Sequence, residues 1–288
     1  MKTKKSITLY PDYYNAKNNE IYLFSAYKSN LEHSKKIILP SFHFHLKYYR
    51  NVRFEDFLFI LIILSETILK RIKTNFSLVK YYFKIKKVSE LIVTCSYNKM
   101  TDHILEIAKK NGIKTIEMQH GHLTKEHVFY KSGIPFVEEY WCWDENYAAL
   151  LKTFEPKINT KIIGYPFPKT NLLEKKNKIN SILIIDQWSI REEIIDLTNE
   201  IIEKNPDLKI TYKLHPNKKF WPKKKLFTIN KNIVVLKSQK RIIDICSSYD
   251  AVIGAFSTGL IEAKLSNVHT FLFQGYNDEI LIKNEIAR

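Results

Sequence analysis

The chain has 288 residues, 45% of them hydrophobic and 26% charged, a balance typical of a globular protein with one large or two medium domains. Its 46 Lys and Arg residues against 30 Asp and Glu give a net charge of +16, which suits nucleic acid, an anionic membrane surface or a phosphorylated substrate. The three cysteines are scattered within apolar runs. This excludes a disulfide framework and predicts reduced, buried side chains in a cytosolic protein.

The first 90 residues carry few structural signals. The basic N-terminus is not followed by the apolar segment of a signal peptide. We expect short strands at 21–24 and 36–39 and a helical pattern from about 54 to 87. Its apolar centre, 57–64, is shorter than the roughly 20 residues that span a bilayer. The flank at 70–87 is rich in Lys and can rest on an anionic membrane surface through Tyr81, Tyr82 and Phe83.

From residue 91 the chain alternates between strand and helix patterns. Strands are predicted at 91–95, 114–118, 139–143 and 161–163, with helices at 102–110 and 145–153. The pattern breaks at 164–168, and the charged stretch 174–180 favours exposure. We therefore place a domain boundary after Pro168, which gives domains 1–168 and 169–288.

The second domain resumes the alternation. Strands are predicted at 181–186, 208–214, 233–236, 251–254 and 270–273, and helices at 191–204, 241–248 and 259–265. Repeated βαβ units predict an α/β fold with two Rossmann-like domains facing a cleft. In such sheets ligands bind at the carboxyl ends of the strands, so three strand ends become candidate sites.

The first candidate follows the strand at 114–118 and has the sequence Gln119-His120-Gly121-His122. A histidine beside a glycine at a strand end can face a cleft, where its near-neutral pKa suits removal of a proton from a hydroxyl. His120 is the predicted base. The alternatives are a tight turn at Gly121 with solvated histidines, or a metal cluster of His120, His122 and His127.

The second candidate is Lys213-Leu214-His215-Pro216, at the end of the strand from 208. Pro216 restricts His215 to an extended backbone and so fixes the direction of its ring, which can donate a hydrogen bond to a phosphate oxygen. Lys213 adds a positive charge for the same phosphate. The alternative is an ordinary His-Pro pair without function.

The third candidate is the turn Ser257-Thr258-Gly259 between a β-branched strand and a helix. Hydroxyls and backbone N–H groups at a helix N-terminus form an anion site, to which the helix dipole contributes. The alternative is that Ser257 or Thr258 only caps the helix. Glu262, one turn on, can accept hydrogen bonds from ribose hydroxyls or act as a surface carboxylate. The Gly-Lys-Ser/Thr ending of a Walker A loop is absent.

The three motifs occur in a recognisable order: Gln-His-Gly at 119–121, Lys-Leu-His-Pro at 213–216 and Ser-Thr-Gly-Leu-Ile-Glu-Ala at 257–263. Over about residues 90–275 the chain resembles the GT-B glycosyltransferases of bacterial surface polysaccharides. It is most similar to capsule-type transferases and polysialyltransferase-like proteins, followed by the glycerophosphotransferases of teichoic acid synthesis. This resemblance implies a cytoplasmic enzyme, peripheral at the inner face of the cell membrane, that builds capsule or lipopolysaccharide glycan.

The resemblance also implies roles for the motif residues. A nucleotide-sugar donor would be held in the second domain, and His120 would deprotonate a glycan or lipid-linked acceptor beside Gln119, Gly121 and His122. The donor-binding residues would be Lys213, His215, Pro216, Ser257, Thr258, Gly259 and Glu262. Such enzymes commonly need no metal or cofactor, and the sequence has no Asp-x-Asp. It also lacks the Asp/Glu-Asp/Glu-Gly motif of several sialyltransferase families, which argues against a CMP-sialic acid donor.

Two other functions compete with glycosyl transfer. A nucleotide-sugar 2-epimerase shares the two-domain architecture, although its expected Asp-Ser-Gly-Gly turn is replaced here by the sequence at 256–259. A basic nucleic-acid-binding protein would explain the charge of +16 and the 17 Phe, 17 Tyr and 4 Trp residues. No recognised nucleic-acid-binding module occurs in the sequence, so we expect no nucleic-acid partner.

Overall fold

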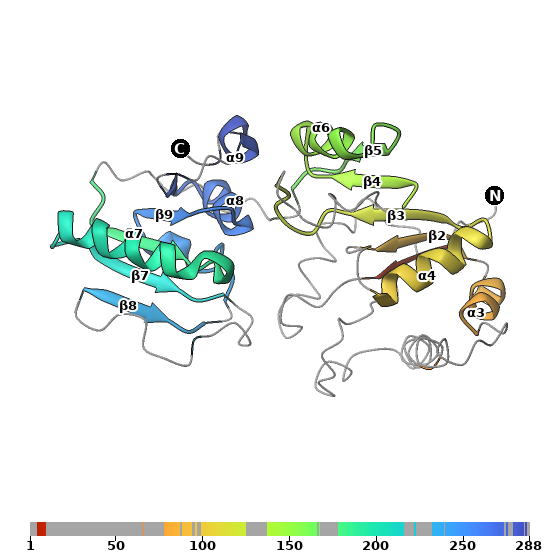
Figure 1. The fold of residues 1–288 in the computed structure, drawn as a ribbon, viewed down its shortest axis with the longest axis horizontal. Coiled ribbons are helices and arrows are strands. Elements are labelled where there is room, and N and C mark those ends of the chain that lie inside the picture. The colour runs from red at the N-terminus through yellow and green to blue at the C-terminus, as the bar shows by residue number, and fades with distance from the viewer. Residues whose placement is uncertain are drawn as a thin grey trace. The chain divides into compact units, whose positions relative to one another are not determined.

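The computed structural model describes residues 5–9, 65, 78–86, 88–93, 96, 99–124, 137–165, 167, 178–215, 222, 232–238, 240–273, 275, 279–284 and 286. Three of the predicted features lie outside these residues: the strands at 21–24 and 36–39 and the apolar run at 57–64. The chain divides into two compact units, Met1–Pro166 and Phe167–Arg288 (Figure 1). Among the described helices, none has the length and apolarity needed to cross a membrane.

Unit 1 contains a parallel sheet of five strands in the order β1-β2-β3-β4-β5. These are β1 (Lys5–Leu9), β2 (Val88–Val93), β3 (Lys114–Met118), β4 (Glu139–Cys142) and β5 (Asn159–Ile162). Its described helices are α3 (Leu78–Lys86), α4 (Lys99–Lys110) and α6 (Glu145–Phe154). Helix α4 packs on β2, β3 and α3, and α6 packs on β4 and β5 (Figure 1).

Helix α4 illustrates how the sequence specifies these elements. Its side chains Ile104, Leu105 and Ala108 are fully buried, in the spacing that places apolar residues on one helix face. The helix ends where Gly112 adopts a φ of 67° and donates its N–H to Lys109 O at 3.0 Å. Glycine adopts this conformation without steric cost, so the predicted stop is confirmed.

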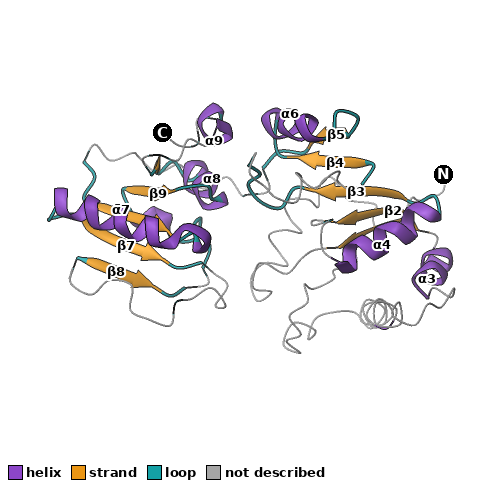
Figure 2. Ribbon diagram, in the orientation of Figure 1, coloured by secondary structure: helices purple, strands orange, loops and turns teal. Residues whose placement is uncertain are grey.

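Unit 2 contains a second parallel sheet of five strands, in the order β10-β9-β6-β7-β8. These are β6 (Ser181–Ile185), β7 (Lys209–Lys213), β8 (Ile233–Leu236), β9 (Ala251–Gly254) and β10 (His269–Leu272). Its described helices are α7 (Arg191–Lys204), α8 (Thr258–Leu265) and α9 (Glu279–Lys283) (Figure 2). The described residues also form two 3-10 turns, η3 (Trp188–Ile190) and η5 (Cys246–Ser248).

The order of these strands reverses at β6. The chain passes from β6 to β7 and β8 on one side, and then returns to place β9 and β10 on the other side. This is the doubly wound arrangement, whose ligands bind outside the carboxyl ends of the strands where the direction switches. The predicted α/β class with Rossmann-like parallel sheets is confirmed for both units.

The core of unit 2 forms where α7 covers one face of the sheet (Figure 1). Ile194, Thr198 and Ile202 are spaced four residues apart on α7 and are buried. At the amino ends of the strands, Asp250 Oδ2 accepts hydrogen bonds from the backbone N–H groups of Asn180 and Ser181, each at 2.9 Å. This carboxylate joins the start of β9 to the start of β6.

Some expectations were wrong. The helix predicted at 241–248 is instead a series of turns that ends in η5, in which Asp244 N–H donates to Arg241 O and Ile245 N–H donates to Ile242 O. The N–H of Ile243, which would have no partner within a helix that starts at 241, is donated to the Glu262 carboxylate at 2.9 Å. Strand β1 was not predicted. The prediction of reduced, buried cysteines is confirmed for Cys142 and Cys246.

Candidate functional site

The candidate donor site lies at the carboxyl ends of three adjacent strands of unit 2. Asp186 follows β6, His215 follows β7 after one residue, and Ser257 follows β9 after two. Because β6 pairs in parallel with both β7 and β9, these three ends meet at one edge of the sheet. This edge includes the point where the strand order reverses.

Asp186 is the most connected side chain at this edge. It is 1% exposed and accepts hydrogen bonds from Arg191 Nε at 2.8 Å, Arg191 Nη2 at 2.6 Å and Tyr212 Oη at 2.9 Å. A fourth hydrogen bond comes from the backbone N–H of His215 at 3.2 Å. A buried carboxylate with a bidentate arginine and two further donors is fully satisfied, which makes it a rigid anchor.

The Asp186 anchor fixes the start of the loop that carries His215. Burial lowers the pKa of the His215 imidazole, and the nearby cations Lys213 and Arg191 lower it further, against the opposing attraction of Asp186. The ring is therefore neutral near pH 7, with one N–H to donate. Pro216 lies outside the described residues.

Lys213 points into the protein. The residue is 3% exposed, and its Nζ lies 3.5 Å from Leu214 O and 3.4 Å from Ser238 O. Burial lowers the pKa of this amine, while the carboxylates of Glu262 and Asp186 raise it. Lys213 thus places positive charge beneath the strand ends.

Helix α8 begins at the turn that follows β9. Ser257 is its N-cap, with its Oγ accepting the N–H of Gly259 at 3.1 Å, so the capping interpretation of Ser257 holds. Thr258 is the first helical residue. A Cβ on Gly259 would lie 2.6 Å from Ile242 Cγ1 and 2.8 Å from Ile185 Cδ1. Glycine is therefore required by the close approach of α8 to β6 and to the 241–248 segment.

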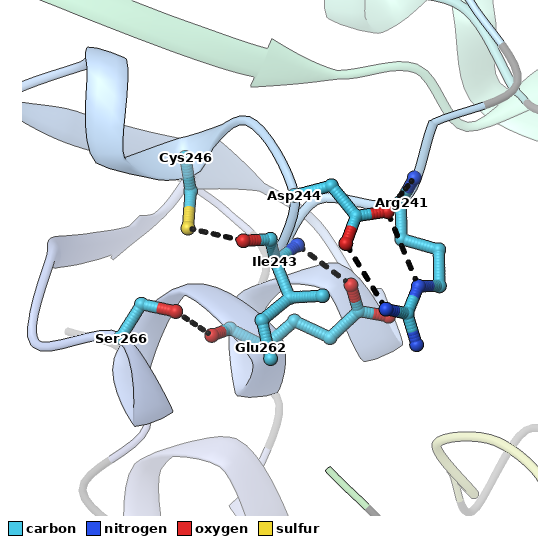
Figure 3. A network of polar contacts seen from close by, with 6 residues as sticks. All are labelled: Arg241, Ile243, Asp244, Cys246, Glu262 and Ser266. Carbon is cyan, nitrogen blue, oxygen red and sulfur yellow. Dashed lines mark hydrogen bonds and ion pairs between the residues drawn. The ribbon is translucent and has the colours of Figure 1, made fainter. Parts of the chain in front are cut away.

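Glu262 is 3% exposed, so it is not a surface carboxylate. Its Oε2 accepts the N–H of Ile243 at 2.9 Å, and Figure 3 shows this contact beside the ion pair of Arg241 with Asp244. Burial raises the pKa of Glu262 to about 7, partly offset by the Ile243 hydrogen bond and by Arg241. A buried carboxyl group that titrates near neutrality is characteristic of functional sites.

The unit 1 candidate lies at the carboxyl ends of β3 and β4. Gln119 is fully buried: its Oε1 accepts the N–H of Trp143 and its Nε2 donates to Gly121 O, each at 2.9 Å. The indole N–H of Trp143 also donates to Gln119 O at 3.1 Å. Gln119 therefore holds the Gly121 turn against the end of β4.

His120 and His122 follow in this turn, and both are half-buried. His122 Nδ1 shares a hydrogen bond of 2.6 Å with the Tyr147 hydroxyl on α6. That helix is capped by Asp144, whose Oδ1 accepts the N–H of Asn146 at 2.9 Å. His122 is consequently oriented by a partner. His127 lies outside the described residues, and no three metal-binding side chains gather among the described ones.

Sequence reasoning missed Asp186, Arg191 and Tyr147. The signal for Asp186 was present: an acidic residue directly after the apolar run 182–185, with an arginine five positions later. Such a carboxylate is buried by its strand and must have a partner. Tyr147 gave no signal, because its contact with His122 depends on how α6 packs.

Comparisons with known proteins agree with this fold. No protein-family model matches the chain, and no curated protein matches its sequence. Its fold is similar to that of S. aureus MnaA bound to UDP, with a TM-score of 0.61, 13% identity and coverage of 99% of this chain and 83% of that one. It is also similar to M. jannaschii UDP-GlcNAc 2-epimerase bound to UDP-GlcNAc and UDP, with a TM-score of 0.58, 13% identity and coverage of 97% and 86%.

A third solved structure is WaaB, a lipopolysaccharide outer core galactosyltransferase in its apo form. It has a TM-score of 0.55, 8% identity and coverage of 93% of this chain and 80% of that one. At such identities the likeness shows the fold alone. That fold is the GT-B type, which glycosyltransferases share with UDP-GlcNAc 2-epimerases.

Proposed function

We propose that the chain is a glycosyltransferase that uses a nucleotide-sugar donor. The observation that carries the proposal is the edge of unit 2 where His215, held by Asp186, and the N-terminus of α8 follow neighbouring strands at the reversal of strand order. This is where a doubly wound sheet binds nucleotides. Two of the similar structures contain UDP, which supports a uridine nucleotide as the first donor to test.

In the proposed reaction the acceptor oxygen attacks the anomeric carbon while the bond from that carbon to the donor phosphate breaks. Negative charge grows on the departing phosphate. The neutral His215 ring is a preorganised donor for it, and the positive end of the α8 dipole stabilises the same charge. The proposed base for the acceptor proton is His120. We propose that the reaction needs no metal, in line with the lack of an Asp-x-Asp sequence.

The proposed acceptor is a surface glycan, of capsule or lipopolysaccharide type, or its lipid-linked precursor at the inner face of the membrane. Helix α3 supports contact with anionic lipid, because it exposes Tyr81 (60%) and Ile85 (57%) next to the exposed Lys80 and Lys84. Of the three aromatic residues expected at such a surface, only Tyr81 qualifies. Tyr82 and Phe83 belong to the core of unit 1.

A 2-epimerase is the second candidate, since a UDP-GlcNAc 2-epimerase shares the fold over 97% of this chain. An epimerase would invert the C2 centre of its nucleotide sugar without any acceptor. A transferase would leave that centre unchanged and require an acceptor.

The deciding experiment is a thermal-shift panel with CMP, CDP, UMP, UDP, GDP and a short oligonucleotide. A ligand at about 100 times its dissociation constant stabilises the fold by roughly 2.7 kcal/mol. The matching nucleotide sugar is then incubated alone and followed by NMR, where a new C2 epimer would identify an epimerase. A shift with the oligonucleotide and none with nucleotides would contradict the proposal.

Variants then test the assigned roles. His120→Ala should abolish transfer and keep donor affinity, whereas His215→Ala should weaken donor binding. The matched control is His269→Ala, because His269 starts β10 and lies at the amino end of the sheet. Full turnover by His120→Ala would show that another group is the base. Unchanged transfer in EDTA is the result expected of a metal-independent reaction.

A further inference from the structure

An exposed tryptophan follows β6 at the same edge of unit 2. Trp188 is 53% exposed, whereas Trp141 and Trp143 of unit 1 are 6% and 1% exposed. Among the large hydrophobic side chains that unit 2 exposes in its described part, Trp188 is the largest; the others are Ile179, Val234 and Ile282. The exposed indole offers a flat apolar face on which a ring of a ligand can stack.

The loop that carries Trp188 is rigid. Asp186 and Arg191 form a bidentate ion pair that closes residues 186–191, and Ile190 N donates to Gln187 O at 3.1 Å within η3. Ile190 also packs against the core of unit 2. Trp188 and Ser189 are left at the exposed apex of this closed turn. A ligand would therefore bind an aromatic surface that is already ordered, which avoids an entropic cost.

The position of this turn also fits a ligand at the strand ends. Trp188 comes two residues after Asp186, and β6 is flanked by the strand that leads to His215 and the strand that leads to Ser257. The two strands beside β6 thus lead to groups that can bind a phosphate, and β6 itself leads to the indole of Trp188. A nucleotide sugar has the matching chemistry: phosphates that link a nucleoside to a pyranose, with a face on the nucleobase and on the pyranose that can stack on an indole.

We propose that Trp188 is a stacking surface for one ring of the donor, either the nucleobase or the pyranose. This inference rests on the proposed function and identifies a binding residue that the motifs do not contain. Stacking of a base on an aromatic side chain contributes about 1–3 kcal/mol, so Trp188→Ala should raise the donor dissociation constant by roughly 5- to 150-fold. Trp188→Phe keeps a stacking ring and should raise it less.

The test combines calorimetry with intrinsic fluorescence, using UMP, UDP, UDP-GlcNAc and N-acetylglucosamine 1-phosphate as separate probes, with CDP, GDP and CMP in parallel. A ring bound on Trp188 should change the tryptophan fluorescence of the wild type but not that of Trp188→Phe. Trp221→Phe, which removes another tryptophan of the chain, should keep the change. Ser189→Ala, in the same exposed turn, is the matched control for affinity. Loss of affinity for UMP and UDP would assign the nucleobase, and loss confined to the two sugar-containing probes would assign the pyranose.

The outcomes separate this inference from the proposed function. If the wild type binds a probe and Trp188→Ala binds it equally well, the stacking role is wrong and the proposed function stands. If no nucleotide or nucleotide sugar binds to the wild type by calorimetry, the proposed function fails and the stacking role fails with it. If Trp188→Ala does not fold, the stacking role is still tested by comparing the ligand-dependent fluorescence change of the wild type with that of Trp188→Phe.

Discussion

Replacing Gly259 by alanine tests the close packing beneath the candidate donor site. The added Cβ would lie 2.6 Å from Ile242 Cγ1 and 2.8 Å from Ile185 Cδ1, both below normal van der Waals contact. Ile185 can move its terminal methyl group, but Ile242 meets the new atom with the middle of its side chain. Overpacking of this kind costs about 1–3 kcal/mol, and the higher helix propensity of alanine returns up to about 1 kcal/mol. We therefore expect a net loss of about 1–2 kcal/mol in the free energy of unfolding.

Gly254→Ala is the matched control, because Gly254 is the last residue of β9 in the same strand-turn-helix unit. A Cβ there would lie 3.5 Å from the nearest atoms of Leu260, an ordinary contact, so stability should be unchanged or slightly higher. Urea denaturation of both variants, monitored by circular dichroism, measures the difference. The packing argument would be refuted by a Gly259→Ala variant at least as stable as the wild type.

Three further predictions follow from buried groups. Asp186→Asn breaks a buried ion pair and should lower the free energy of unfolding, measured in urea, by about 3 kcal/mol. The control Glu200→Gln breaks an exposed pair and should lower it by less than about 1 kcal/mol. Equal losses in the two variants would contradict this prediction. Folding raises the pKa of Glu262 from 4.5 to about 7. Between these pH values the carboxyl group is protonated in the folded chain and ionised in the unfolded chain. The stability of the wild type should therefore fall as the pH rises through this window. Glu262→Gln should remove that fall, by up to about 3 kcal/mol between pH 4.5 and 7.5, and an unchanged pH profile would contradict the assignment. Burial raises the pKa of Cys142 to about 12, so mass spectrometry should find it alkylated by iodoacetamide only after unfolding, and labelling of the native chain would show that the thiol is accessible.

The sequence predicts the sheets well because buried parallel strands have a strong signature. Runs such as 182–185 and 251–254 contain no polar side chain, each follows a polar residue, and each lies in a strand. The segment 241–248 is half apolar, and one of its backbone groups has a distant partner: the carboxylate of Glu262, 19 residues later, accepts the N–H of Ile243. Local patterns cannot reveal such a partner.

The candidate site shows the same division between local and tertiary information. The strand-end positions of His120, His215 and Ser257 follow from the order of the elements alone, because parallel strands place their carboxyl ends along one edge. The residues that orient them do not. Tyr147 reaches His122 across 25 positions in the chain, and Asp186 reaches the backbone of His215 across 29.

The pairing of β1 with β2 has a consequence for the order in which unit 1 assembles. Lys5 lies opposite Val88 in the register of the two strands, so β1 leaves the ribosome more than 80 residues before the strand it pairs with. At about 5–20 residues per second, β1 waits roughly 4–17 s for its partner during synthesis. The β6–β7 pair of unit 2 spans far fewer residues and closes a shorter loop. Pairing of edge strand β1 with β2 is therefore expected to be slower than pairing of β6 with β7.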